Sequence, residues 1–119
     1  MLLSTSNVNL ATSASISVIS GSIEDGLGLS GAIDDNINSY VGFSQNTNNI
    51  IQFDFGSTIL PSSLSSIKFW QYFDDGRSYY NVQLQISNDA TNWFNIYGPS
   101  TTAFTSSGII VPLYSLCTL

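Results

Sequence analysis

Hydrophobic and polar residues alternate along much of the chain, with apolar side chains at every second position. The clearest stretch covers residues 79–87 (YYNVQLQIS). There Val82, Leu84 and Ile86 share one face, and amide side chains occupy the positions between them. A period of two places successive side chains on opposite faces of a β-strand, whereas no segment keeps the 3.6-residue period of a helix. The pattern therefore predicts an all-β protein.

Further short strands are separated by residues that favour turns. Besides residues 79–87, we expect strands over residues 14–18, 49–56, 67–73, 93–97 and 109–111. The segment from Gly21 to Gly31 contains four glycines and is predicted to be a loop. Short strands with turns between them are typical of a β-sandwich or barrel. No linker or internal repeat interrupts them, so residues 1–119 are predicted to form a single domain.

The alternating positions also define an expected hydrophobic core. Apolar residues that share one face of a strand, and the tryptophan that follows the turn at residues 88–92, are expected to be buried. They are Ile51, Phe53, Phe55, Val82, Leu84, Ile86 and Trp93. If Leu84 is fully buried, its replacement by alanine should cost about 2–5 kcal/mol.

The chain carries unusually little charge. Charged residues make up 8% of the sequence, with 2 basic against 8 acidic side chains and a net charge of −6. Nucleic acids and anionic membrane surfaces are recognised through Lys and Arg, so both are excluded as partners. Serine, threonine and asparagine together fill about a third of the sequence, which indicates a surface solvated by hydroxyl and amide groups.

Several kinds of chemistry are ruled out by the residues that are missing. The sequence has no histidine and a single cysteine, Cys117, which excludes Ser–His–Asp and Cys–His catalysis, zinc sites, iron–sulfur clusters and an internal disulfide. Cys117 is interpreted as a small hydrophobic residue, with an intermolecular disulfide as the alternative. Apolar runs are too short for membrane insertion, and residues 1–4 (MLLS) do not resemble a signal peptide.

Six short motifs follow one another in a characteristic order. They are residues 9–11 (NLA), 32–36 (AIDDN) with Ser39 and Tyr40, 51–56 (IQFDFG), 67–70 (IKFW), 75–82 (DGRSYYNV), and 86–89 (ISND) with Asn92 and Trp93. In this order they resemble the discoidin, or coagulation factor 5/8 type C, family over residues 9–97. The resemblance implies an antiparallel two-sheet sandwich of jelly-roll type, of the galactose-binding-like class. Residues 76–81 (GRSYYN) are most similar to versions in bacteriophage structural proteins.

The sequence departs from the family pattern at its turns and at its end. Asp35 and Ala90 stand where the family has glycine, and Ser39 stands where it has threonine. If the turn needs a positive φ at Ala90, that residue costs about 1 kcal/mol; otherwise the left-handed residue moves to Asn88 or Asn92. The family's closing strand, with its aromatic and basic pattern, is missing after Pro112.

The resemblance implies a calcium loop between Ala32 and Tyr40. Side-chain oxygens of Asp34, Asn36 and Ser39, with the carbonyls of Ala32 and Asn36, are the expected ligands. A hard cation prefers such oxygens, and the chain offers no softer ligand set. The alternative is an Asx turn held by hydrogen bonds without a metal.

A second cluster of residues suits a carbohydrate ligand. Aromatic rings stack on the apolar face of a sugar while carboxylate and guanidinium groups bind its hydroxyls. The candidate ligand-binding residues are Tyr72, Phe73, Asp74, Asp75, Arg77 and Tyr79. The alternative is that Arg77 is a structural partner of Asp54 or Asp75 and that the aromatic residues are core. Paired carboxylates are sequence neighbours and point to opposite faces of a strand, so an enzyme is not expected.

These observations support two functional hypotheses. The first is a non-enzymatic recognition module that binds cell-surface glycan within a virion or another multicopy assembly. The second is a purely structural capsid or tail decoration subunit. Either would act at an extracellular or virion surface, with copies of itself or other subunits as partners. The apolar ends at residues 1–3 and 113–119 are expected to pack on neighbouring chains, unless the C-terminal segment replaces the missing strand within its own chain.

Overall fold

The computed structural model describes residues 1–26, 28–43, 48–57, 59–73 and 75–113, with only the backbone described at residues 25 and 61. Within these residues the regular elements are β-strands and short 3₁₀ helices. The strands are β1 (Leu2–Ser4), β2 (Ser15–Ser20), β3 (Ile23–Gly26), β4 (Val41–Phe43), β5 (Ile50–Asp54), β6 (Leu64–Phe69), β7 (Ser78–Ile86), β8 (Phe94–Ala103) and β9 (Ile109–Pro112). The 3₁₀ helices are η1 (Leu10–Ser13), η2 (Leu29–Ala32) and η3 (Pro61–Ser63). In this part of the chain, no helix has the length and apolar character needed to cross a bilayer.

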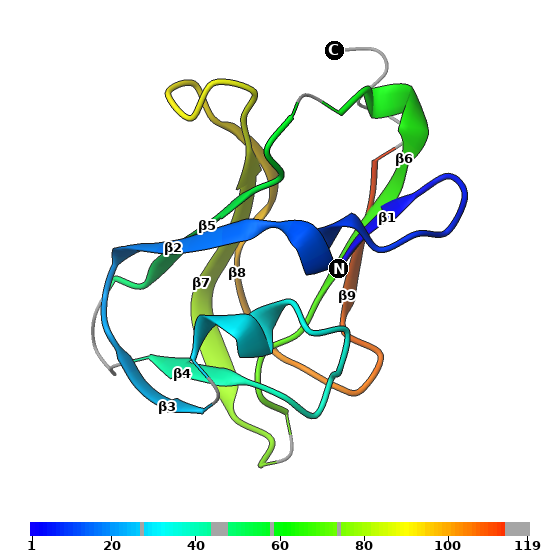
Figure 1. The fold of residues 1–119 in the computed structure, drawn as a ribbon. Helices are drawn as coiled ribbons and strands as arrows, with labels where there is room; N and C mark the ends of the chain where they lie inside the picture. Colours follow the sequence, from blue (N-terminus) through cyan, green and yellow to red (C-terminus); the bar gives the residue numbers. More distant parts are fainter. Residues whose placement is uncertain (27, 44–47, 58, 74, 114–119) are drawn as a thin grey trace.

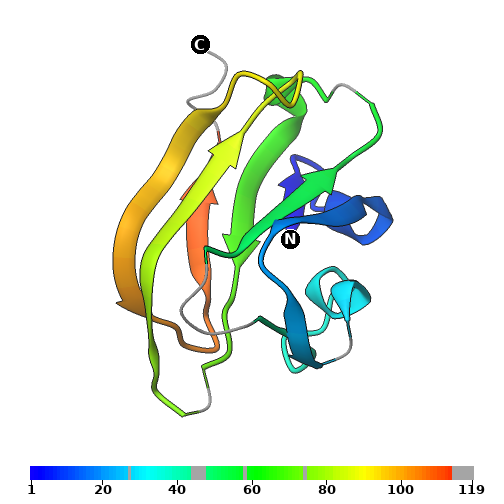
Figure 2. The ribbon, with the colours of Figure 1, turned by 90° about the vertical axis from the view of Figure 1, so that its left-hand side faces the viewer.

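The strands form two layers, as the all-β prediction requires. One layer is the antiparallel three-stranded sheet β1–β6–β9. The other contains the long β7–β8 hairpin and the β2–β5 pair, which lie in front of that sheet in Figure 2. The short β3–β4 pair lies at one end of the molecule, as Figure 1 shows. The predicted two-sheet galactose-binding-like sandwich is therefore confirmed.

The core fills the space between the layers. Its buried hydrophobic residues are Leu2, Ala11, Phe104, Val111 and Leu113, with Leu113 only 1% exposed, and all of them except Phe104 form one cluster. Partly buried side chains from β6, β7 and β8 pack against them, among them Phe69, Leu84 and Tyr97. The expected core residues Ile51, Phe55, Val82, Leu84 and Ile86 are half-buried.

Two residues expected in the core are exposed instead. Phe53 is 38% exposed because β5 has only β2 as its hydrogen-bonded partner, so its faces are not fully enclosed. Trp93 is 42% exposed and lies directly before β8, in the turn between β7 and β8. Period-two alternation assigned Phe53 to one face of its strand, and Trp93 was expected in the core from its position after a turn. Neither pattern indicates which elements cover these side chains.

Three short strands were not expected from the pattern. The segment from Gly21 to Gly31, predicted as a loop, contains β3 and part of η2, and β3 pairs with β4. Strand β1 pairs with β6 through Leu2 and Ile67, and Leu2 is only 6% exposed. The apolar N-terminal residues therefore complete the protein's own sheet, and their expected packing on a neighbouring chain is wrong for Leu2.

At the C-terminal end, Leu113 is the last residue that the structure describes. The backbone N–H of Leu113 donates to the Ser65 carbonyl at 2.9 Å and continues the pairing between β6 and β9. Leu113 is thus part of the protein's own core. Residues 114–119, which were expected to pack on another chain or to replace the missing strand, lie outside the described residues.

Candidate ligand-binding site

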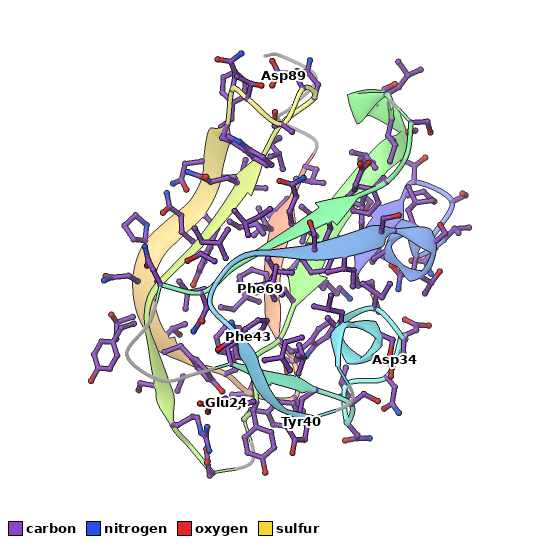
Figure 3. All side chains as sticks on the ribbon, turned by 60° about the vertical axis from the view of Figure 1, so that its left-hand side comes forward. Glu24, Asp34, Tyr40, Phe43, Phe69 and Asp89 are labelled. Atoms are coloured by element: carbon purple, nitrogen blue, oxygen red, sulfur yellow. The ribbon has the colours of Figure 1, made fainter. Side chains whose placement is uncertain are left out.

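Tyr72, Phe73, Asp75 and Arg77 lie in the connection between β6 and β7, at one end of the sandwich (Figure 1), and Tyr79 follows on β7. The β8–β9 connection lies beside it, because Nε1 of Trp70 donates to the Ser106 carbonyl at 3.0 Å. The turn that carries Asp89 lies at the opposite end, as Figure 3 shows. The candidate ligand-binding residues therefore lie at the end of the molecule that is remote from the Asp89 turn.

Arg77 and Asp75 form an exposed ion pair in this connection. Nε of Arg77 donates to both carboxylate oxygens of Asp75, at 2.9 and 2.8 Å, and Nη2 also donates to Oδ2. The Arg77 and Asp75 side chains are 53% and 43% exposed. The Arg77 hydrogen bonds hold the pKa of Asp75 below its usual value, and the pKa of Arg77 is raised by the same contact. Arg77 therefore has Asp75 as its partner, and both groups reach solvent.

Tyr72 presents its ring beside this ion pair. The guanidinium carbon of Arg77 lies 5.2 Å from the ring centroid of Tyr72, within the range of a cation–π contact. Tyr72 is 37% exposed, so part of its ring remains accessible. We refer to Tyr72, Asp75 and Arg77 as the Tyr72 site.

Tyr79 lies beneath this site and fixes its backbone. Its hydroxyl donates to the Tyr72 carbonyl at 3.0 Å. Its ring packs edge-on against Phe104 with centroids 5.7 Å apart, and Phe104 is only 4% exposed. Burial raises the pKa of Tyr79. Tyr79 was predicted to contact the ligand, and in the structure it is placed to position Tyr72.

The structure also brings in a residue that the sequence analysis did not assign to this site. Tyr40, directly before β4, lies with its ring centroid 5.3 Å from that of Tyr72 and its plane tilted by 60°. Tyr40 is 38% exposed. Figure 3 shows Tyr40 and Glu24 toward the end opposite Asp89. No motif links Tyr40 to Tyr72, since the two are distant in sequence; the only signal was an aromatic residue within a polar segment.

The remaining predicted ligand residues have different environments. Phe73 is half-buried, and its carbonyl accepts a hydrogen bond from the Gly76 N–H at 3.4 Å. Asp74 lies outside the described residues. Tyr72, Asp75, Arg77 and Tyr79 are thus the members of the predicted set that the structure brings together.

The predicted calcium loop is built from successive turns. Oδ1 of Asp34 accepts from the Asn36 N–H at 3.0 Å, and Oδ1 of Asn36 accepts from the Asn38 N–H at 3.0 Å. The Asn36 carbonyl accepts from the Ser39 N–H at 3.1 Å. These bonds form the Asx turns of the alternative interpretation and hold the loop without an ion.

The donor set in this loop suits a hard cation but contains little charge. Asp34 is the only carboxylate among the three predicted side-chain ligands. The neighbouring Asp35 accepts a hydrogen bond at Oδ1 from the side-chain amide of Asn9, at 3.1 Å. In the described part of the chain, no three acidic, histidine or cysteine side chains gather at a potential metal site. Calcium binding by Asp34, Asn36 and Ser39 therefore stays a prediction.

A comparison with protein families bears on this arrangement. The family described as the NedA-like, galactose-binding domain of F5/F8 type C matches residues 31–111. The chain belongs to this family. The matched segment of this F5/F8 type C domain includes the Tyr72 site, Tyr40 and the Asp34 loop, whereas β1, η1, β2 and β3 precede it. Comparisons with curated proteins and with solved structures gave no match.

Proposed function

We propose that this F5/F8 type C domain is a non-enzymatic carbohydrate-recognition module that binds a neutral glycan at the Tyr72 site. The observation that carries the proposal is an exposed aromatic ring held against an exposed Arg–Asp pair at one end of the sandwich. The description of the family as galactose-binding supports the same class of ligand.

The chemistry of the site matches the two kinds of surface on a sugar. The apolar C–H face of a pyranose stacks on the Tyr72 ring, and its hydroxyls bind at the rim. Arg77 donates to Asp75 through Nε and Nη2, and its side chain is 53% exposed, so the guanidinium can also donate to a sugar hydroxyl. The carboxylate of Asp75 accepts hydrogen bonds from hydroxyls in the same way.

Charge favours an uncharged sugar over an acidic one. The Arg77 guanidinium is already neutralised by Asp75, so the site offers no excess positive charge. The whole chain carries a net charge of −6, which disfavours the approach of an anionic glycan. A neutral hexose is therefore the expected ligand.

We further propose that the domain acts in many copies at an extracellular or virion surface. A small exposed site binds a single sugar weakly, and linked copies gain strongly from effective concentration. The purely structural decoration subunit is the competing function, and it differs in binding no glycan.

A glycan array followed by calorimetry with the best neutral ligand tests the proposal. Tyr72→Ala and Arg77→Ala should each reduce affinity at least tenfold, while circular dichroism and the melting curve show a folded protein. Tyr80→Ala is the matched control, because Tyr80 is 80% exposed on β7 and lies outside the Tyr72 site. Binding that survives both substitutions in folded protein, or an array without any neutral ligand, would refute the proposed function.

A further inference from the structure

We infer that Tyr40 forms a second sugar subsite next to Tyr72, so that the domain recognises two linked sugar units instead of one. This inference rests on the proposed function and extends it from a ligand class to a ligand length. It also assigns a binding role to a residue outside the predicted ligand-binding set.

The starting observation is an aromatic pair that stays accessible. The Tyr40 and Tyr72 rings lie 5.3 Å apart between centroids, yet they are 38% and 37% exposed. Aromatic rings in contact gain free energy by burying their faces, as Phe69 and Phe104 do in the core of this protein. Two touching rings that both keep about a third of their surface in solvent provide a continuous apolar surface for a ligand.

The shape of this surface distinguishes one sugar unit from two. A single tyrosine ring is about as large as one pyranose ring, so Tyr72 alone accounts for one unit. The Tyr40 ring is tilted by 60° against that of Tyr72 and therefore presents a second face in a different direction. Two pyranoses joined by a glycosidic bond also present their faces in different directions, so a bent pair of rings is suited to a disaccharide.

Separate parts of the fold hold the backbone segments that carry the two rings. Tyr72 is fixed by the hydroxyl of Tyr79, which is anchored on the buried Phe104. The backbone at Tyr40 is held by the close pairing of β3 with β4, since a Cβ at Gly26 would lie only 2.3 Å from the Tyr40 carbonyl oxygen. A surface ordered before binding loses less conformational entropy when the ligand binds.

Arg77 places a polar group beside the Tyr72 ring. The Arg77 guanidinium lies over Tyr72, at 5.2 Å from its centroid. Tyr72 therefore belongs to the subsite that also binds hydroxyls, and Tyr40 adds a stacking surface for the neighbouring unit. Loss of Tyr40 should consequently weaken binding of a disaccharide more than binding of a monosaccharide.

Calorimetric titration with methyl β-galactoside and with lactose tests this assignment. We expect the unmodified domain to bind lactose about fivefold more tightly, the gain given by one additional stacking contact. Tyr40→Ala should remove the preference for lactose, so that the variant binds both sugars with similar affinity. Tyr72→Ala should weaken binding of both sugars.

Saturation-transfer NMR gives a second measurement that does not depend on affinity. In the unmodified domain, protons of the glucose unit of lactose should receive saturation from the protein, and Tyr40→Ala should remove this transfer selectively. Tyr40→Leu keeps apolar bulk without a flat ring and replaces the alanine variant if that variant unfolds; Tyr40→Phe should behave like the unmodified protein.

The outcomes separate the inference from the function on which it rests. If Tyr72→Ala abolishes binding while Tyr40→Ala and Tyr40→Leu keep the preference for lactose, the second subsite is wrong and the sugar site stands. Equal affinity of the unmodified domain for both sugars has the same meaning. If the unmodified domain binds neither sugar, the second subsite is overturned, and a glycan array without any neutral ligand would overturn the carbohydrate-recognition function as well.

Discussion

Two residues adopt a left-handed backbone at positions where the family has glycine. Asp35 has a φ of 61° and Ala90 a φ of 58°. Asp35 shares its turn with Asn36 and is held by Asn9, whereas the Ala90 N–H donates to Oγ of Ser87 at 2.9 Å. The turn has thus kept its left-handed residue at Ala90, and it has not moved to Asn88 or Asn92. A side chain in this conformation clashes with its own backbone, which costs about 1 kcal/mol for alanine.

Ala90→Gly should therefore stabilise the protein by about 1 kcal/mol and raise the melting temperature by a few degrees. The measurement is thermal and urea unfolding. Ala103→Gly is the matched control, because Ala103 ends β8 without a positive φ, and it should lower stability instead. An Ala90→Gly variant no more stable than the parent would show that the turn relaxes the strain in another way.

Asp89 organises the same turn through its carboxylate. Oδ1 accepts from the backbone N–H groups of Asn92 and Thr91 at 2.8 and 2.9 Å, and Oδ2 accepts from the Asn92 amide at 2.9 Å. The hydrogen bond from the Asn92 N–H is the largest of the effects that hold the pKa of Asp89 well below its usual value. A carboxylate with a lowered pKa stabilises the fold above its ordinary pKa and loses that contribution as the pH falls below it.

Asp89→Asn should lower stability near neutral pH and reduce the loss of stability on acidification below about pH 4. Melting temperatures of the parent and the variant, measured from about pH 6 to pH 2, should converge toward the acidic end. Curves that stay parallel over this range would show that the charge of Asp89 does not stabilise the turn.

At the scale of elements, β1 and η1 close the sheet that carries β6 and β9. Leu2 on β1 is 6% exposed, and Oδ1 of Asn9 accepts from the N–H groups of both Leu2 and Ala11 at 3.1 and 3.0 Å. One asparagine therefore caps η1 and holds β1 beside it. The motif at residues 9–11 has a structural role that connects the first strand to the core.

Leu2→Ala should destabilise the domain by about 2–5 kcal/mol, since it leaves a cavity beside Val111 and Leu113 in the buried cluster. Leu3→Ala is the matched control on the same strand. Leu3 is only half-buried, so a smaller loss is expected. Chemical denaturation gives both values, and equal losses would contradict the assignment of Leu2 to the core.

The Asp34 loop is the element in which a cation would act. If calcium binds there, as the family resemblance implies, it should raise the melting temperature by mass action. Because Asp34 is the only carboxylate in the predicted ligand set, we expect an effect at millimolar and not at micromolar calcium. Asp34→Asn should remove the effect, while Asp35→Asn, which changes a carboxylate bonded to Asn9, should retain it. Melting curves that are identical with calcium and with chelator would retire the calcium prediction.

At the scale of the whole molecule, the site lies at one end and the surface carries few charges. Side chains such as Leu60, Phe94 and Ile110 are more than half exposed, at 68%, 59% and 55%. Leu2 and Leu113 were expected to pack on neighbouring chains, but both are buried in the protein's own core. Association with copies of itself or with other subunits remains a prediction.

Display in several copies should convert weak binding into stable attachment. A biotinylated domain on tetrameric streptavidin should be retained on a lactose-coated biosensor with an apparent affinity about 10²–10⁴-fold above that of the single domain. The same tetramer carrying Arg77→Ala is the control for binding through the Tyr72 site and should dissociate at once. Equal retention of the single and tetrameric forms would show that multivalency adds nothing.

The sequence by itself determined the fold class and the longest strands. The alternation at residues 79–87 corresponds to β7, and the pattern at residues 49–56 contains β5, because a period of two is a local property that survives folding. The order of the short motifs was sufficient to identify the family, and it placed Asp75, Arg77 and Tyr79 close to Tyr72 along the chain. Residues that are near in sequence and joined by one turn stay near in space.

The tertiary structure alone decided which strands pair and which side chains are covered. Strands β1, β3 and β4 are too short to show a period. Strand β1 forms by pairing with β6, and β3 and β4 form by pairing with each other. The alternation predicted which face of its strand carries Phe53, but not whether another element covers that face. It also gave no indication that Tyr40 lies against Tyr72. Strand pairing joins residues distant in sequence, so its result depends on the path of the whole chain. The second aromatic ring of the candidate site is therefore a product of the fold and not of any local motif.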